Sequence, residues 1–357
     1  MRILPLAAAA AMLVLLGGCA QGPETPRPVS FEVGEGAQGG VTVAEYDLGD
    51  TAYRDPVSGT VSELRAVVHH PRRFTGRLPL IIQAHGSWWA CDSQDAAEWP
   101  CEGGARPFPS YRGYDYLGAA LAARNFVVVS ISVDGINQTS FDYGDRARLI
   151  NAHLALWRQL ADGGGPLAGV LRPLARHVDI GNVGTMGHSR GGKGVMWQAS
   201  DKHRGEWPAG VRVRAVLPLA PVKFDDPAGD FSDTLVTRVP VAVMTGTCDG
   251  ATGEAGQEYL DDAEGRTRVP AYSVSVTAAN HNYFNTRWTP PALFGEDDST
   301  CPERELTPAA QRDALAAYAI AFYERYLHGD KRYDAVLTGR TPLPGVTSKA
   351  RVVTPSR

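Results

Sequence analysis

The sequence predicts an α/β protein with a mainly parallel sheet and helices on both of its faces. From about residue 61, apolar runs rich in β-branched residues alternate with stretches of helical periodicity, which is typical of such a sheet. One of these runs leads directly into a glycine-rich segment, 187–192, and helix-compatible residues follow it. With 357 residues and an apolar share of 43%, the chain can bury a substantial core.

The expected strands are short runs in which apolar and β-branched residues dominate. They cover residues 63–68, 78–84, 126–133, 178–185, 215–219, 239–245 and 271–276. Helices are expected over 116–124, 146–160 and 307–327, where apolar residues recur at helical spacing. The last helix opens with Thr307-Pro308, an N-cap followed by a proline in the first turn.

The N-terminus has the features of an export signal. Arg2 precedes an apolar stretch, 4–16, that is too short to span a bilayer as a stable anchor. The next residues, Leu16-Gly17-Gly18-Cys19, resemble a bacterial lipobox, whose cysteine becomes the acylated first residue of the mature protein. The resemblance implies a signal peptide over 1–18 and a lipid on Cys19, which would hold the protein on a membrane surface of the bacterial cell envelope, outside the cytoplasm. The alternative is an ordinary cleaved signal in which the cysteine is incidental.

The remaining chain is expected to form one domain. Residues 19–28 are polar and proline-rich, which suits a tether between lipid and domain. The domain itself is expected over 29–330, and a tail rich in Thr, Pro and Arg over 331–357. The formal net charge of −4 gives the chain no basic field for a phosphate backbone or an acidic membrane face, so nucleic acid is not an expected partner.

The segment from Gly187 to Gly191 is a GxSxG motif between an expected strand and an expected helix. On such a sharp turn the hydroxyl of Ser189 would project above the sheet, while glycines tolerate the crowding and the helix N-terminus favours negative charge. A glycine-rich turn that merely needs small residues is the simpler interpretation. The flanking strand and helix favour Ser189 as a nucleophile instead.

A serine nucleophile needs a base, and the base needs an orienting carboxylate. Asp249 and His281 follow the last two expected strands, at turns where such side chains can converge. The other histidine between Ser189 and the last helix, His203, lies in a charged segment, so elimination favours His281 as the base. The carboxylates in the loop after the preceding strand are alternative acids: Asp225, Asp226, Asp230 and Asp233.

Acyl transfer also needs two N–H donors for the developing oxyanion. The first is expected to be the backbone N–H of Arg190, directly after the nucleophile. The second is expected after the strand over 78–84, where His85-Gly86 resembles the HG segment of esterases. The backbone N–H of either Ser87 or Trp88 is expected to be that donor. The simpler interpretation of His85-Gly86 is an ordinary strand end.

Together, the strand order, the serine turn, the acid and the histidine resemble the α/β-hydrolase superfamily over about residues 61 to 327. The chain order Ser189, Asp249, His281 matches that superfamily. The stretch 219–239 leaves little room for a large cap domain, as in compact secreted esterases, dienelactone-hydrolase-like proteins and bacterial polyester hydrolases. Many polyester hydrolases carry GHSMGG, and this chain departs from them at Arg190.

The resemblance implies hydrolysis of a carboxylic ester, small or polymeric, through an acyl-enzyme. The same residues would serve an amidase, a peptidase or an acyltransferase, and a non-catalytic, surface-tethered binding protein on this fold is a further alternative. Neither a cofactor nor a metal is expected, because no Cys or His cluster has metal-site spacing.

Four cysteines remain when Cys19 is set aside, an even set in a chain expected in an oxidising compartment. Four cysteines allow three pairings. We expect Cys91 with Cys101, which are close in sequence, and Cys248 with Cys301, which would join the acid turn to the segment after the histidine.

Overall fold

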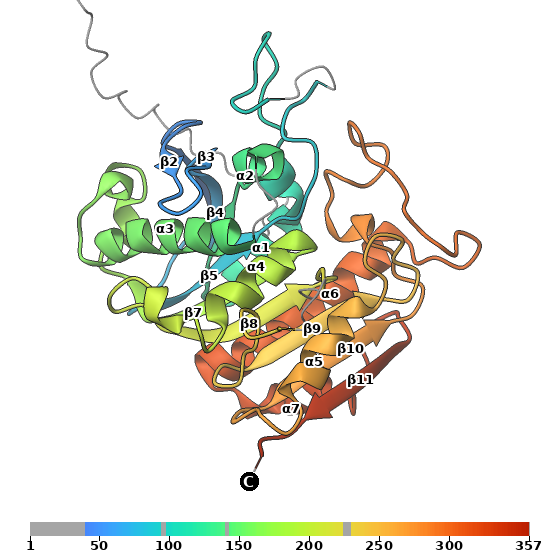
Figure 1. Ribbon diagram of the computed structural model, residues 1–357. Coiled ribbons are helices and arrows are strands. Elements are labelled where there is room, and N and C mark those ends of the chain that lie inside the picture. The colour runs from blue at the N-terminus through green and yellow to red at the C-terminus, as the bar shows by residue number, and fades with distance from the viewer. Residues whose placement is uncertain (1–39, 94–97, 140–142, 224–229, 357) are drawn as a thin grey trace, which may run out of the picture.

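The computed structural model describes residues 40–93, 98–139, 143–223 and 230–356. It confirms the predicted class: a nine-stranded, mainly parallel sheet lies between two layers of helices (Figure 1). The strand order is β1-β4-β6-β5-β7-β8-β9-β10-β11, in keeping with an α/β-hydrolase fold.

The parallel part of the sheet consists of strands that the sequence predicts. In spatial order they are β6 (Val127–Ile131), β5 (Leu78–Ala84), β7 (Val178–His188), β8 (Val213–Leu219), β9 (Val241–Gly246) and β10 (Ala271–Val276). Within β5, Leu80 and Ile82 join one buried cluster while Ile81 joins another. Both faces of β5 are therefore buried, which explains why apolar residues dominate such central strands in the sequence.

Antiparallel strands extend the sheet at both edges. On one side lie β4 (Arg65–Pro71), predicted over 63–68, and β1 (Val41–Asp47). On the other side, β11 (Ser348–Val353) pairs with β10. The segment expected as a tail is thus part of the fold as far as Val353, because β11 hydrogen-bonds to the sheet edge and Leu337 and Leu343 are buried.

Helices cover both faces of the sheet. On one face lie α3 (Tyr143–Ala161), α4 (Arg190–Ala199) and α5 (Glu258–Ala263), and on the other α1 (Asp115–Ala122) and α6 (Pro308–Tyr323). These include the three predicted helices. The predicted start of α6 is confirmed, since the Thr307 hydroxyl accepts the N–H of Ala310 at 3.2 Å.

Short elements complete the fold. They are β2 (Tyr53–Arg54), β3 (Val61–Ser62), α2 (Asp134–Thr139), α7 (Asp334–Leu337), a π-helical turn η7 (Glu324–His328), and the 3-10 turns η1 (Ser110–Tyr114), η2 (Pro166–Gly169), η3 (Arg172–Leu174), η4 (Arg204–Glu206), η5 (Ala255–Gln257), η6 (Asn282–Phe284) and η8 (Lys331–Tyr333). Between β8 and β9 the described residues form neither helix nor strand, so no large cap stands there. None of the described helices is both long and apolar enough to cross a membrane.

The carboxyl ends of the parallel strands meet at one edge of the sheet, where ligands bind in folds of this kind. We call it the site edge. The segments that follow β5, β7, β9 and β10 there carry all the residues expected to do chemistry.

Candidate active site

Ser189 stands at the turn from β7 into α4, with φ 57° and ψ −121°. This is a strained conformation for a residue other than glycine. Gly187 and Gly191 make the turn possible. A Cβ on Gly187 would lie 2.0 Å from the Gly191 carbonyl oxygen, and a Cβ on Gly191 would lie 2.5 Å from the Ala84 carbonyl oxygen. Neither position can therefore hold a side chain.

Asp249 and His281 form a buried pair. His281 Nδ1 lies 2.8 Å from Asp249 Oδ2, and the carboxylate is fully enclosed. The backbone N–H groups of Ala251 and Thr252 donate to Oδ1 at 2.8 and 2.7 Å, and the Thr252 hydroxyl donates to Oδ2 at 3.0 Å. Burial acts to raise the pKa of Asp249, but the hydrogen bonds from His281 and Thr252 outweigh it and hold that pKa below its usual value.

The ionised carboxylate fixes the proton on the histidine. The carboxylate of Asp249 can only accept a hydrogen bond, so the proton of the neutral His281 imidazole lies on Nδ1. The lone pair therefore lies on Nε2. This is the tautomer that can take a proton from a nucleophile.

His188 brings the serine turn and the histidine loop together. Its ring centroid is 4.6 Å from that of His281, and its Nδ1 is 2.8 Å from the Tyr114 hydroxyl. Burial, with the charge of His281 as a second cause, lowers the pKa of His188 well below its usual value. This neighbour of Ser189 therefore stays neutral.

The alternative acids lie elsewhere or outside the described residues. Asp233 is 2.8 Å from His203 and 2.6 Å from Lys202. The side chain of Asp230 accepts the backbone N–H of Ser232 at 2.8 Å. Asp225 and Asp226 fall in the undescribed segment 224–229. Among the candidate acids that the structure describes, Asp230, Asp233 and Asp249, it is Asp249 that pairs with His281.

Asp298 is a site residue that the sequence reasoning missed. Its carboxylate accepts the backbone N–H groups of His281 at 3.1 Å, Asn282 at 3.0 Å and Gly250 at 3.2 Å. It therefore holds the histidine loop against the acid turn. No sequence pattern predicts such a role, because the partners of Asp298 are backbone N–H groups that only folding brings together.

Asp249, His281 and Asp298 are also the group that could hold a metal, with donor atoms within 4.8 Å of one another. Each donor already has a partner: Nδ1 faces Asp249, and Asp298 accepts backbone N–H groups. The hydrogen-bonded arrangement accounts for the cluster, and the expectation of no metal stays a prediction.

Both expected disulfides form. Cys91–Cys101 closes the loop after β5, and Cys248–Cys301 spans 53 residues with its Cα atoms 5.5 Å apart. Beside the second bond, the N–H of Thr300 donates to the Cys248 carbonyl at 2.9 Å. The acid turn is thus joined covalently to the segment after His281.

Replacing Cys248 by serine is expected to lower thermal stability and the turnover of an ester substrate together. In the loop-entropy account a bridge of this span stabilises the fold by about 4 kcal/mol, and its loss also loosens Asp249 beside it. Thermal melting and turnover of p-nitrophenyl acetate measure the two effects. Cys91→Ser is the matched control, since it should affect the rim while leaving the acid turn intact. Equal loss of activity in both variants would contradict this role.

The loop after β5 touches the serine turn, because a Cβ on Gly86 would lie 2.6 Å from Ser189 Cβ. The Gly86 carbonyl accepts from His85 Nδ1 at 2.8 Å and from Asn137 Nδ2 at 3.1 Å. His85 Nε2 in turn accepts the N–H of Val133 at 3.0 Å, which assigns the proton to Nδ1. The Gly86-Ser87 peptide is therefore held from its carbonyl side.

Aromatic side chains line this part of the site edge. Trp88 stacks on Trp288 with ring centroids 5.0 Å apart, and Trp288 stacks on His188 at the same distance. Trp89 is 40% exposed and lies 5.3 Å from Phe294. The buried ring of Trp288 thus lies next to the contact between Gly86 and Ser189, and Trp89 adds exposed apolar surface on the loop after β5.

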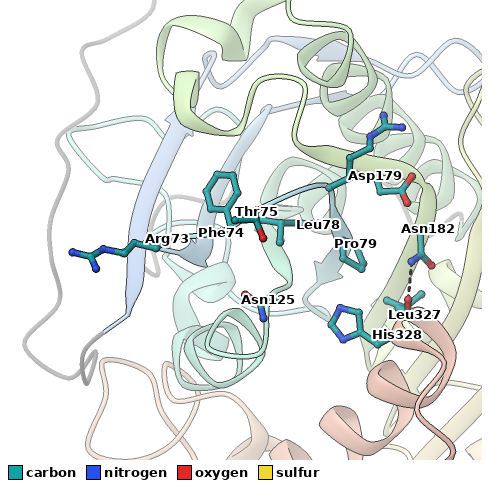
Figure 2. Close-up of a pocket in the computed structure, with 11 residues that line it drawn as sticks. Arg73, Phe74, Thr75, Leu78, Pro79, Asn125, Asp179, Asn182, Leu327 and His328 are labelled. Atoms are coloured by element: carbon teal, nitrogen blue, oxygen red, sulfur yellow. Dashed lines mark hydrogen bonds between the residues drawn. The ribbon is translucent and has the colours of Figure 1, made fainter.

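A cavity of about 610 Å³ lies away from these residues. Figure 2 shows its lining at the starts of β5 and β7, with Asn125 and His328 opposite them. Parallel strands start at the edge opposite the site edge, so this cavity is not part of the candidate active site.

The fold is in keeping with an α/β-hydrolase architecture, and comparison with known proteins finds distant relatives. No family model matches the chain. It is 25% identical over 241 residues to a bis(hydroxyethyl) terephthalate hydrolase of Streptomyces coelicolor, covering 66% of this chain and 60% of that protein. It is 25% identical over 235 residues to the cutinase est2 of Thermobifida alba, covering 64% and 61%. The chain is thus a distant homologue of ester hydrolases, and spans about three fifths of their length.

Proposed function

We propose that this chain is a serine hydrolase that cleaves carboxylic esters through an acyl-enzyme. The observation that carries the proposal is the buried Asp249–His281 pair, joined through His188 to the strained turn of Ser189. Distant homology to two ester hydrolases supports the same chemistry.

The proposed reaction has two halves. His281 Nε2 takes the proton of Ser189 Oγ as the oxygen attacks the ester carbonyl, and the tetrahedral intermediate then expels the alcohol, which receives that proton. A water molecule next loses a proton to His281 and attacks the acyl-enzyme, which releases the acid and restores the serine. The enclosed carboxylate of Asp249 holds the imidazole and stabilises its charged form.

The hydrogen bonds of Gly86 favour Ser87 over Trp88 as the second oxyanion donor. In a trans peptide the N–H points away from the carbonyl. Because His85 and Asn137 hold the Gly86 carbonyl, the Ser87 N–H is fixed in the opposite direction without any rearrangement during the reaction. Such preorganised donors are the effective ones. The first donor in this proposal is the N–H of Arg190.

Asn137→Ala is expected to lower kcat roughly ten-fold with little change in KM, because it removes one of the two hydrogen bonds that hold the peptide whose N–H acts only in the transition state. Steady-state kinetics on p-nitrophenyl acetate measure this split. Asn151→Ala is the matched control, since its amide side chain bonds to the Gln198 side chain and the Glu206 carbonyl, away from Gly86. A rise in KM with unchanged kcat would argue against a role in positioning the donor.

A fluorophosphonate probe tests the proposal against a non-catalytic binding protein, because it labels only an activated serine. We expect one label, on Ser189.

A panel of short esters, bis(hydroxyethyl) terephthalate and peptide amides then separates esterase from amidase or peptidase. The exposed aromatic surface around Trp89 favours aromatic esters in this panel. Product analysis with added alcohol detects acyl transfer.

The proposed location is a membrane surface of the bacterial cell envelope, outside the cytoplasm, with a lipid on Cys19. Cys19, the signal peptide and the tether over 19–28 lie outside the described residues. The two disulfides support an oxidising compartment.

A further inference from the structure

Arginines gather at the edge of the sheet opposite Ser189. They lie just after β4, in the segments that lead into β5, β7 and β8, and at the start of β8 itself. We define the basic edge as Arg72, Arg73, Arg77, Arg176, Arg212 and Arg214, all of which are exposed. The net charge of the chain does not reveal this cluster of arginines, because folding separates positive and negative side chains that are mixed along the sequence.

Hydrogen bonds make these arginines neighbours in space. The N–H of Leu78 donates to the His177 carbonyl at 2.7 Å, which brings Arg77 beside Arg176. The N–H of Arg212 donates to the Ile180 carbonyl at 3.0 Å and continues the row. Figure 2 shows Arg73 extending away from the cavity that lies within this edge.

The cationic charge of the basic edge is not neutralised within the fold. Among the described residues, no carboxylate forms an ion pair with any of the six. Arg77 and Arg214 donate only to carbonyl oxygens, at 3.3 Å each. The cavity lining contributes one carboxylate here, Asp179.

At the site edge, acidic side chains outnumber basic ones in the loop after His281. The loop after His281 contains five acidic residues, Glu296, Asp297, Asp298, Glu303 and Glu305, against two arginines, Arg287 and Arg304. An anionic surface would therefore attract the basic edge and repel the site edge.

The chain reaches the fold at the basic edge. β1 starts with Val41 opposite Pro71, and the Gly40 carbonyl accepts the N–H of Arg72. Everything that precedes residue 40, including Cys19, is attached at this point. A lipid on Cys19 would thus tether the domain from the side that carries the arginines.

We propose that the basic edge docks on an anionic lipid bilayer, with the active-site edge turned away from it. The partner is recognised by its phosphate charge, and each arginine close to such a surface strengthens binding about five-fold. Ionic strength weakens the contact, because exposed charges are screened. The inference does not depend on the proposed catalysis.

The test uses the full chain with Cys19→Ser, so that no lipid is attached. Sedimentation with vesicles of phosphatidylcholine, with and without phosphatidylglycerol, should give binding only to the anionic vesicles, with release by added sodium chloride. Adding Arg73→Glu, Arg77→Glu and Arg176→Glu should weaken that binding at least roughly fifty-fold. Circular dichroism and thermal melting show whether the variant is folded.

A matched control carries the same change of charge at the site edge, as Arg54→Glu, Arg106→Glu and Arg304→Glu. It should bind anionic vesicles almost as the parent does. Equal losses in the two variants would show an effect of net charge and overturn the proposal. So would equal binding to both kinds of vesicle, or full binding by the basic-edge variant.

Discussion

Ser189→Ala is expected to reduce turnover of p-nitrophenyl acetate to the uncatalysed background, a loss of roughly a million-fold. The hydroxyl forms the covalent bond in the proposed reaction, and no other group at the turn can replace it. The fold should persist, because alanine fits the space of serine. Unchanged thermal melting, together with loss of fluorophosphonate labelling, would separate lost chemistry from lost structure.

Ser200→Ala is the matched control, since this buried serine lies at the other end of α4 and its hydroxyl only accepts the N–H of His203. Labelling and turnover should stay near those of the parent. Labelling that survives in Ser189→Ala would place the nucleophile elsewhere.

Asp249→Asn is expected to lower kcat roughly 10⁴-fold while KM changes little. An amide in place of the carboxylate can donate to Nδ1 and so leave the imidazole in the tautomer that cannot accept the serine proton. Steady-state kinetics and fluorophosphonate labelling rates measure the loss.

The substitution also removes a pH dependence. The pKa of Asp249 is held below its usual value, so this carboxyl stabilises the fold above the ordinary pKa of aspartate, and the stabilisation is lost as pH falls through the lowered pKa. The parent should therefore lose more stability in acid than the variant does, as thermal melting would measure. Asp233→Asn, at the alternative acid, should keep near-parental activity. A larger loss there than in Asp249→Asn would mean that the acid is misassigned.

The central sheet could be predicted because its strands are buried on both faces. Every residue of β5 and β6 is buried and all but Gln83 and Ser130 are apolar, so the sequence of these strands predicts them by itself. The edge strands β1 and β11 are mostly half-exposed and mix charged residues such as Glu45 and Lys349 with apolar ones. They become strands because a neighbour offers unpaired backbone groups, which the local sequence does not reveal.

The same distinction applies to the candidate site. Asp249 and His281 each follow a predicted strand, and their pairing could be anticipated from parallel strands ending at one edge. Asp298 and Asn137 could not, because each acts on backbone groups whose position depends on the whole fold. The segregation of arginines to one edge was hidden in the same way by a net charge summed over the chain.

The two ends of the described chain leave the sheet on the same side. Val41 pairs with Pro71 at one end of the row of strands, and Val353 pairs with Ala271, the first residue of β10, near the other. Both positions lie opposite Ser189. The domain can therefore be fused to a display partner, or coupled to a solid support, through either terminus without covering the side on which a bulky or polymeric substrate would approach.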